Sequence, residues 1–154
     1  MNIEDVINIE EIKRVKNLYS YYWDGGELDK LMDLFADDGA CEFGAKYGNW
    51  VGKAAVAAGF RGLWERNASA GRLPFQVIHA FANPVIDITG PDTATGRWFL
   101  MEFTTTEGEN HPPRNFGVYH DEYRKVAGEW KIVRTSVDLL WPNRDIKSEQ
   151  QAPD

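Results

Sequence analysis

Apolar residues recur at three- and four-residue steps near the start of the chain, a spacing typical of an amphipathic helix. The apolar stripe consists of Ile12, Val15, Leu18, Tyr19 and Tyr22. The positions between them are polar and are expected to face solvent; they include Glu10, Glu11, Lys13, Arg14, Lys16 and Asn17. Gly25-Gly26 is expected to end this helix, because glycine readily adopts the left-handed conformation that closes a last turn.

The segment that follows alternates between short helices and short strands. A second helix is predicted from Glu27 to Phe35, and Asp37-Asp38-Gly39 is a turn signal. Two strands are then predicted at Ala40–Phe43 and Lys46–Val51. Gly52 precedes a third predicted helix, Lys53–Asn67, which is rich in alanine.

The remainder of the chain has the pattern of a sheet. Strand-like runs are separated by turn-forming residues, and they cover Leu73–Ala82, Val85–Thr89, Thr93–Thr106, Arg114–Val126 and Glu129–Leu139. Runs of this length indicate a strongly bent antiparallel sheet. Helices followed by a meander of strands predict an α+β fold, with a polar tail beyond Trp141 that is expected to fray.

Composition limits the classes of function. The 154 residues suit one domain, which we expect to span 1–154 with its core at about 9–141 and its tail at 142–154. The formal charge is −7 without a basic run, so no nucleic-acid partner is expected. No stretch reaches the about 20 apolar residues of a membrane helix, and the acidic N-terminus lacks a signal-peptide pattern. We therefore expect a cytoplasmic protein without a membrane partner.

Cofactor and metal signatures are absent from the sequence. There is no GxGxxG after a strand, no P-loop, no GxSxG and no HExxH. His79, His111 and His120 show no ligand spacing, although strands could still bring two of them together. The lone Cys41 can form neither an intramolecular disulfide nor a thiolate cluster, and we expect a buried structural thiol. No cofactor and no metal site are predicted.

His79 and Asp24 are the first candidates for chemistry. Strand alternation places His79 on one face with Phe75, Val77 and Phe81, where it is either a satisfied core residue or the base of an apolar pocket. Asp24 follows the aromatic stripe at a helix C-terminus, which favours cations rather than a carboxylate. An Asp–His pair would fix the imidazole tautomer and make a general base near neutral pH.

Glu102 and a group of aromatic residues complete the candidate site. Glu102 lies in a strand that is apolar on both faces, so it either points inward as a desolvated acid or outward into solvent. Aromatics make up 13% of the chain. Most are expected in the core, and a subset is expected to line a cavity for a flat hydrophobic ligand: Tyr22, Phe43, Trp50, Phe81, Trp98 and Phe116.

A family resemblance covers residues 9 to 141. It is carried by Ile12-Lys13-Arg14 leading to Tyr19 and Asp24, by Leu31–Asp38, by His79, by Asp92–Trp98, and by Tyr119–Tyr123 followed by Gly128–Ile132. The chain resembles a SnoaL-like member of the nuclear-transport-factor-2-like superfamily. This resemblance implies a cone-shaped α+β barrel with helices against a curved sheet and a deep pocket between them.

Within the superfamily, the chain is most similar to scytalone dehydratase and bile acid 7α-dehydratase. The resemblance implies catalytic roles for Tyr19, Asp24, His79 and Glu102. A pocket tyrosine of the bile acid enzyme corresponds to Phe43 here, and an arginine corresponds to Leu139, so the resemblance does not identify the substrate. A regular helix turns about 500° over five residues, which would point Tyr19 and Asp24 about 140° apart. Tyr22 is the substitute if Tyr19 faces the core.

Two classes of function follow. The favoured hypothesis is a cofactor-independent lyase that eliminates water or a similar group from a hydrophobic cyclic or polycyclic small molecule; the same base could run an isomerisation. The alternative is a non-catalytic ligand-binding domain like the small subunits of ring-hydroxylating dioxygenases. The last three strands are apolar on both sides, so a homo-oligomer, a dimer or trimer formed through the outer sheet face, is also expected.

Overall fold

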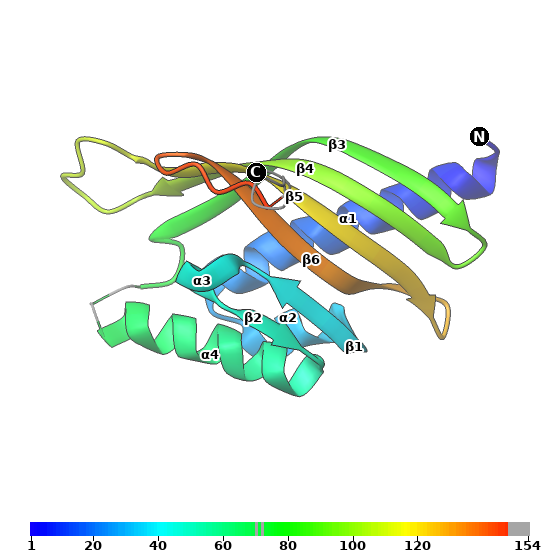
Figure 1. The fold of residues 1–154 in the computed structure, drawn as a ribbon, viewed down its shortest axis with the longest axis horizontal. Helices are drawn as coiled ribbons and strands as arrows, with labels where there is room; N and C mark the ends of the chain where they lie inside the picture. The colour runs from blue at the N-terminus through cyan, green and yellow to red at the C-terminus, as the bar shows by residue number, and fades with distance from the viewer. Residues whose placement is uncertain (70, 72, 148–154) are drawn as a thin grey trace, which may run out of the picture.

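The computed structural model describes residues 1–69, 71 and 73–147. Its elements are α1 (Ile3–Gly25), α2 (Leu28–Asp33), β1 (Phe35–Glu42), α3 (Gly44–Tyr47), β2 (Asn49–Val51), α4 (Lys53–Ser69), β3 (Val77–Gly90), β4 (Thr93–Thr104), β5 (Pro113–Val126) and β6 (Glu129–Trp141) (Figure 1). The strands form one sheet in the order β2-β1-β6-β5-β4-β3, open between its two edge strands. The α+β fold with helices before a curved, mostly antiparallel sheet is confirmed.

The exception to antiparallel pairing is β1, which runs parallel to β6. The predicted second helix was too long, because Phe35 already pairs with Ile132 of β6. The predicted turn at Asp37-Asp38-Gly39 is wrong as well: these residues lie within β1, where the register shifts between Phe35 and Ala40. The turn-forming residues thus coincide with an irregularity inside β1 and do not end the strand.

Two further boundaries differ from the prediction. Lys46 and Tyr47, assigned to a strand, belong to α3, a short helix between Gly44 (φ 81°) and Gly48 (φ 117°). Both glycines adopt the left-handed region of φ, which allows the chain to leave β1 and enter β2 within a few residues. The two runs on either side of Asn83-Pro84 form one strand, β3, and a register shift between Ala82 and Val85 absorbs that dipeptide.

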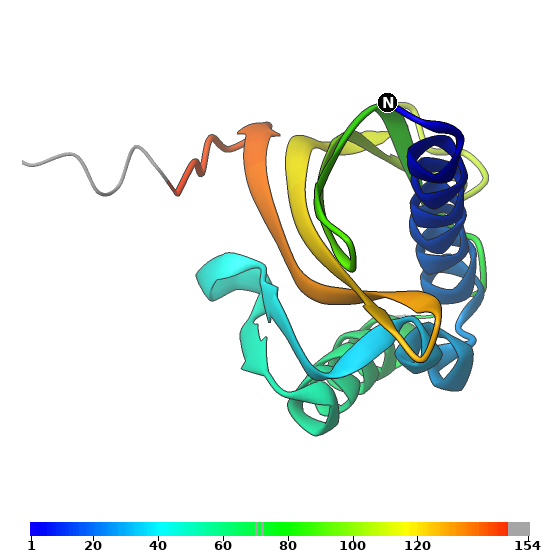
Figure 2. The same cartoon turned by 90° about the vertical axis from the view of Figure 1, so that its right-hand side faces the viewer.

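Helix α1 begins at a capping box in which the side chains of Asn2 and Asp5 each accept a hydrogen bond from the other residue's backbone N–H. It packs mainly against β3 and also against β6, while α4 packs against β1 and β2. Figure 2 shows that β5 and β6 bend strongly and that α1 lies beside the bent sheet. A cavity lined by residues of α1, α4 and β3 to β6 lies between the helices and the inner sheet face.

Lys16 corrects the expected polar face of α1. It is fully buried, and its Nζ lies 2.8 Å from Asp121 Oδ2 on β5. The buried stripe of the helix runs through Ile12, Lys16, Tyr19 and Trp23. Lys16 has the spacing of a core residue, and only its charge suggested exposure.

The start of the tail is attached to the sheet. Asp145 exchanges two backbone hydrogen bonds with Leu139, and the backbone N–H of Lys147 donates to Asp138. Fraying is therefore wrong for residues 142–147, and residues 148–154 lie outside the described residues. In the part of the chain that the structure describes, every helix is too short or too polar to span a bilayer.

Candidate active site

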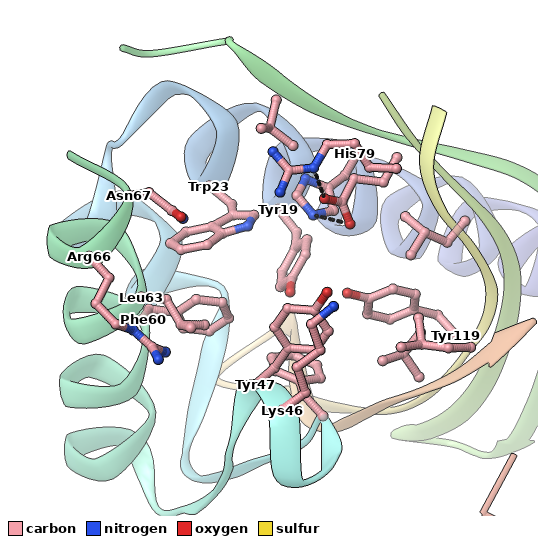
Figure 3. Close-up of a pocket in the computed structure, with 17 residues that line it drawn as sticks. Tyr19, Trp23, Lys46, Tyr47, Phe60, Leu63, Arg66, Asn67, His79 and Tyr119 are labelled. Atoms are coloured by element: carbon pink, nitrogen blue, oxygen red, sulfur yellow. Dashed lines mark ion pairs between the residues drawn. The ribbon is translucent and has the colours of Figure 1, made fainter. Parts of the chain in front are cut away.

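A cavity of about 320 Å³ lies between α1, α3, α4 and the inner face of the sheet (Figure 3). Most of its wall is apolar, and a minority of polar side chains lies among the apolar ones. Its lining consists of Tyr19, Trp23, Phe43, Lys46, Tyr47, Phe60, Leu63, Arg66, Asn67, Val77, His79, Leu100, Glu102, Arg114, Tyr119, Val137 and Leu139. An apolar enclosure with a few converging polar groups is typical of a small-molecule site.

His79 and Asp24 meet at one end of this cavity. His79 Nδ1 lies 2.6 Å from Asp24 Oδ1, and the backbone N–H of His79 donates to Asp24 Oδ2 at 2.7 Å. The Ser20 hydroxyl donates to the carbonyl of His79, and its oxygen also lies 3.3 Å from the same Asp24 oxygen. One carboxylate thus fixes both the backbone and the ring of His79, and α1 is joined to β3 at this point.

Asp24 reaches His79 from outside the main cavity. Helix α1 stays regular through Gly25, so Tyr19 and Asp24 point in different directions, as their spacing requires. Tyr19 lines the main cavity, whereas Asp24 borders a second hollow of about 290 Å³ between α1 and β3. His79 borders both, so the imidazole separates its orienting carboxylate from the ligand space.

Glu102 points inward, toward the free side of the imidazole. In the sheet register Glu102 stands between His79 on β3 and Asn115 on β5. Its Oε2 lies 3.7 Å from His79 Nε2 and accepts a hydrogen bond of 2.8 Å from Asn115. Its Oε1 lies 3.3 Å from Arg114 Nε. The solvent-facing alternative for Glu102 is therefore wrong.

Two phenols border the cavity beneath His79. Tyr19 and Tyr119 are both buried, and their ring centroids lie 6.3 Å apart. Burial is the main cause that raises the pKa of each phenol well above its ordinary value, and a hydrogen bond to Tyr119 raises that of Tyr19 further. Both therefore remain neutral donors over the physiological pH range. Tyr22, the substitute for Tyr19, does not line the cavity.

Among the aromatic residues predicted to bind substrate, the structure brings only Phe43 to the main cavity. Trp50 packs against Phe43 and Phe60, and Trp98 packs against Phe81. Phe81 contacts Tyr19 and borders the second hollow. Phe116 lies on the other side of the sheet beside Phe103 and Trp141, because its neighbour Asn115 faces inward. The wrong assignments reflect strand alternation and core packing, which composition does not reveal.

The sequence interpretation missed several polar residues of the site. Asn115 also donates to the hydroxyl of Tyr47 at 3.3 Å, which links α3 to Glu102. Tyr119, Lys46 and Arg66 line the cavity as well. Alternation from Asp121 would have placed Tyr119 and Asn115 on one face of β5, but no local signal marks Lys46 or Arg66. Within the described residues, no three His, Cys, Asp or Glu side chains converge as metal ligands.

The bent sheet and the helices together enclose an apolar cavity, and a histidine lies in the cavity wall. This arrangement is typical of domains that take up small molecules. The family model of the SnoaL-like domain matches residues 4–136, and the chain belongs to this family.

Solved structures with low sequence identity share the fold. An NTF2-like protein with a cystatin-like fold from Novosphingobium aromaticivorans is 22% identical, with a TM-score of 0.79, over 97% of this chain and 93% of that one. A provisionally assigned scytalone dehydratase from the same organism is 21% identical, with a TM-score of 0.78, over 99% and 100%. ActVI-ORFA from Streptomyces coelicolor is 14% identical, with a TM-score of 0.70, over 85% and 96%. The fold and family indicate a small-molecule-processing domain.

Proposed function

We propose that the protein is a cofactor-independent lyase that removes water, or a similar leaving group, from a hydrophobic cyclic small molecule. The observation that carries this proposal is the 2.6 Å contact between His79 Nδ1 and Asp24 Oδ1, with His79 at the cavity wall. A carboxylate only accepts hydrogen bonds, so Nδ1 carries the proton and Nε2 keeps its lone pair. That lone pair is the general base.

The first step is the removal of an acidic C–H proton by His79 Nε2. The electron pair of the C–H bond forms an enolate, and Asp24 stabilises the imidazolium that results. Glu102, 3.7 Å from Nε2, adds a second carboxyl group beside this charge. Tyr19, a neutral phenol in the cavity wall, is placed to donate to the carbonyl oxygen on which the enolate develops.

The second step expels the leaving group. The enolate electrons form the carbon–carbon double bond as the C–O bond breaks, and the departing oxygen takes a proton from Tyr19. His79 then releases the proton that it took from carbon to solvent, and Tyr19 regains one proton from solvent. Protons and electrons balance without an oxidant or a metal. Support comes from the likeness to a provisionally assigned scytalone dehydratase and from the apolar cavity wall.

Isomerisation is the second candidate. The short distance between His79 and Glu102 favours it. Two proton carriers at the same end of one cavity permit removal of a proton at one carbon and its return at another. A domain that only binds ligands would use neither group.

One pair of probes tests these possibilities. 1-Tetralone has exchangeable protons next to its carbonyl and no leaving group, whereas 3-hydroxy-1-tetralone loses water to give 1-naphthol. We expect the protein to catalyse deuterium exchange into the first probe, followed by NMR, and naphthol release from the second, followed by fluorescence. His79→Ala should abolish both with the melting temperature retained.

The matched control is His120→Ala. His120 also contacts a carboxylate, Asp138, at 3.1 Å, but it does not line the main cavity. It should keep both activities. Exchange without naphthol release would favour the isomerase, and the absence of both would contradict catalysis.

A further inference from the structure

The lining of the cavity is basic although the protein as a whole is acidic. The chain carries a formal charge of −7. The cavity nevertheless has three cationic side chains in its wall, Lys46, Arg66 and Arg114, against the single carboxylate of Glu102. A wall of this kind favours ligands with negative charge, since charge complementarity governs both attraction and specificity.

Only one of these cations is neutralised by a nearby carboxylate. Arg114 lies 3.3 Å from Glu102, whereas Lys46 and Arg66 have no carboxylate within ion-pair distance among the described residues. Several cations elsewhere on the surface do have one: Lys30 with Glu27, Arg124 with Asp38, and Arg134 with Glu42 and Glu122. Lys46 and Arg66 are therefore left with free charge at a cavity.

Each of the two cations has a structural contact, but neither contact uses its hydrogen-bond donors. Lys46 lies over the ring of Tyr47, 5.0 Å from its centroid. Arg66 is in the last turn of α4, where a cation suits the helix dipole. Both side chains are exposed, so they can adjust to a ligand without rearranging the core.

Both cations lie away from the general base in the cavity wall. Figure 3 shows Lys46 on α3, beside Tyr47, and Arg66 on α4, with Phe60 between the two cations and His79 on the far side of both. Apolar side chains, including Phe60 and Leu63 of α4, line the wall as well. A ligand that extends away from the general base would therefore pass apolar surface and come within reach of positive charge on α3 and on α4.

We propose that the ligand is a hydrophobic ring compound with a carboxylate substituent, and that Lys46 and Arg66 bind this carboxylate. The guanidinium of Arg66 can donate two parallel hydrogen bonds to a carboxylate, and Lys46 supplies a point charge. The placement of the reacting C–H bond beside His79 rests on the proposed function. Recognition of the carboxylate itself requires only binding, so the two ideas can fail separately.

The test compares two ligands of nearly equal shape and different charge. 2-Naphthoate and 2-naphthamide are titrated into the protein by isothermal calorimetry at low and moderate salt. We expect naphthoate to bind at least about tenfold more tightly than the amide, as charge-assisted hydrogen bonds are stronger than neutral ones. The preference should shrink as salt increases, because both cations are exposed.

Paired variants locate the effect. Lys46→Met/Arg66→Met should remove the preference for naphthoate and leave amide affinity within about twofold. The matched control is Arg14→Met/Arg61→Met, which makes the same change in net charge at exposed residues outside the cavity lining. It should retain the preference.

Three outcomes would overturn the proposal: equal affinities in the unaltered protein, no binding of either probe at millimolar concentration, or the same loss in the control variant. If charge selectivity is present and the tetralone assays show no catalysis, the lyase is rejected while the carboxylate site stands.

Discussion

Helix α1 carries two buried acid–base contacts to the sheet, and they differ in what surrounds them. Asp24 contacts His79 on β3, and Lys16 contacts Asp121 on β5. Every Asp121 oxygen has a partner within the core: Thr135 donates to one at 2.6 Å, and Tyr123 and Lys16 reach the other at 2.7 and 2.8 Å. His79, by contrast, contacts Asp24 through Nδ1 and borders the cavity.

Aromatic rings surround the ammonium group of Lys16 and separate it from solvent. Its Nζ lies 3.9 Å from the ring centroid of Tyr119, 4.4 Å from that of Phe81 and 4.8 Å from that of Tyr19. Its contact with Asp121 departs from good hydrogen-bond direction, so charge and the aromatic faces hold it in place. Burial lowers the pKa of Lys16, although Asp121 opposes this shift. An acid–base pair can transfer a proton to or from a ligand only when one partner has an atom exposed to the cavity. His79 meets this condition and Lys16 does not.

The largest expected effect is on the open pair. Asp24→Asn keeps an acceptor but places an amide N–H near Nδ1, which favours the tautomer with its proton on Nε2 and removes the general base. We expect kcat to fall about 10⁴-fold, the loss seen when the carboxylate of a carboxylate–histidine pair is removed, with a smaller change in KM. Asp138→Asn, beside His120, is the control and should change kcat little. A loss of less than about tenfold in Asp24→Asn would place the pair among structural contacts.

The closed pair should respond in stability rather than in catalysis. Lys16→Met leaves Asp121 buried without its cation, and breaking a buried pair in this way costs about 3–5 kcal/mol. Urea unfolding at neutral pH measures this loss. The double variant Lys16→Met/Asp121→Asn should recover at least half of it, because no uncompensated charge remains. If Lys16→Met alone has the same free energy of unfolding as the unaltered protein, the contact between Lys16 and Asp121 does not stabilise the fold, and the proposed difference between the two pairs is wrong.

The smallest effect concerns alkaline pH. Burial is the leading cause that raises the pKa of Tyr19, Tyr119 and Tyr123 above the ordinary 10.0. Below that pH the phenols are neutral in both folded and unfolded states, so their contribution to stability is fully present. Above it only the unfolded state loses protons, and the free energy of unfolding falls as pH rises. The effect of Lys16 on the free energy of unfolding has the opposite sign. Its lowered pKa destabilises the folded state at lower pH, and this destabilisation disappears once pH exceeds 10.5.

Near-ultraviolet phenolate absorbance and circular dichroism, recorded together against pH, measure this effect. The absorbance of these three phenols should appear only as the fold is lost. Tyr21, which is 67% exposed, serves as the control through Tyr21→Phe, which should leave this late phase unchanged. Ionisation of the buried phenols before unfolding would show that solvent reaches Tyr19, Tyr119 and Tyr123 in the folded protein, and it would contradict this prediction.

Most elements could be predicted from periodicity, although α3 was missed and β3 was divided in two. The approach of Asp24 to His79 could also be predicted, because each residue is unusual in its own element. A carboxylate at a helix C-terminus and a histidine on an apolar strand face are both conspicuous locally. Lys16 shows the limit of this reasoning. Its neighbours on the helix are charged, and only the position of Asp121 across the core explains its burial.

The remaining site residues depend on register, which local sequence does not specify. Asn115 reaches Glu102 because β4 and β5 pair with Glu102 opposite Asn115. Phe116, one position later, faces away for the same reason. Lys46 lines the cavity because a short helix replaces the predicted strand between Gly44 and Gly48. Long-range pairing therefore decides which of several equally plausible side chains meet the ligand.

The cavity wall is divided along the chain in a way that matters for engineering and for divergence. Residues 43–67 supply Lys46, Arg66 and much of its apolar side, whereas His79, Asp24 and Glu102 lie outside that segment. One uninterrupted stretch of about two dozen residues thus supplies these two cationic side chains, while the proton-transfer groups lie on α1, β3 and β4. Substitutions at the exposed Lys46 and Arg66 can therefore change which ligands bind while the residues that carry protons stay in place, which gives new substrates a short route to an existing base.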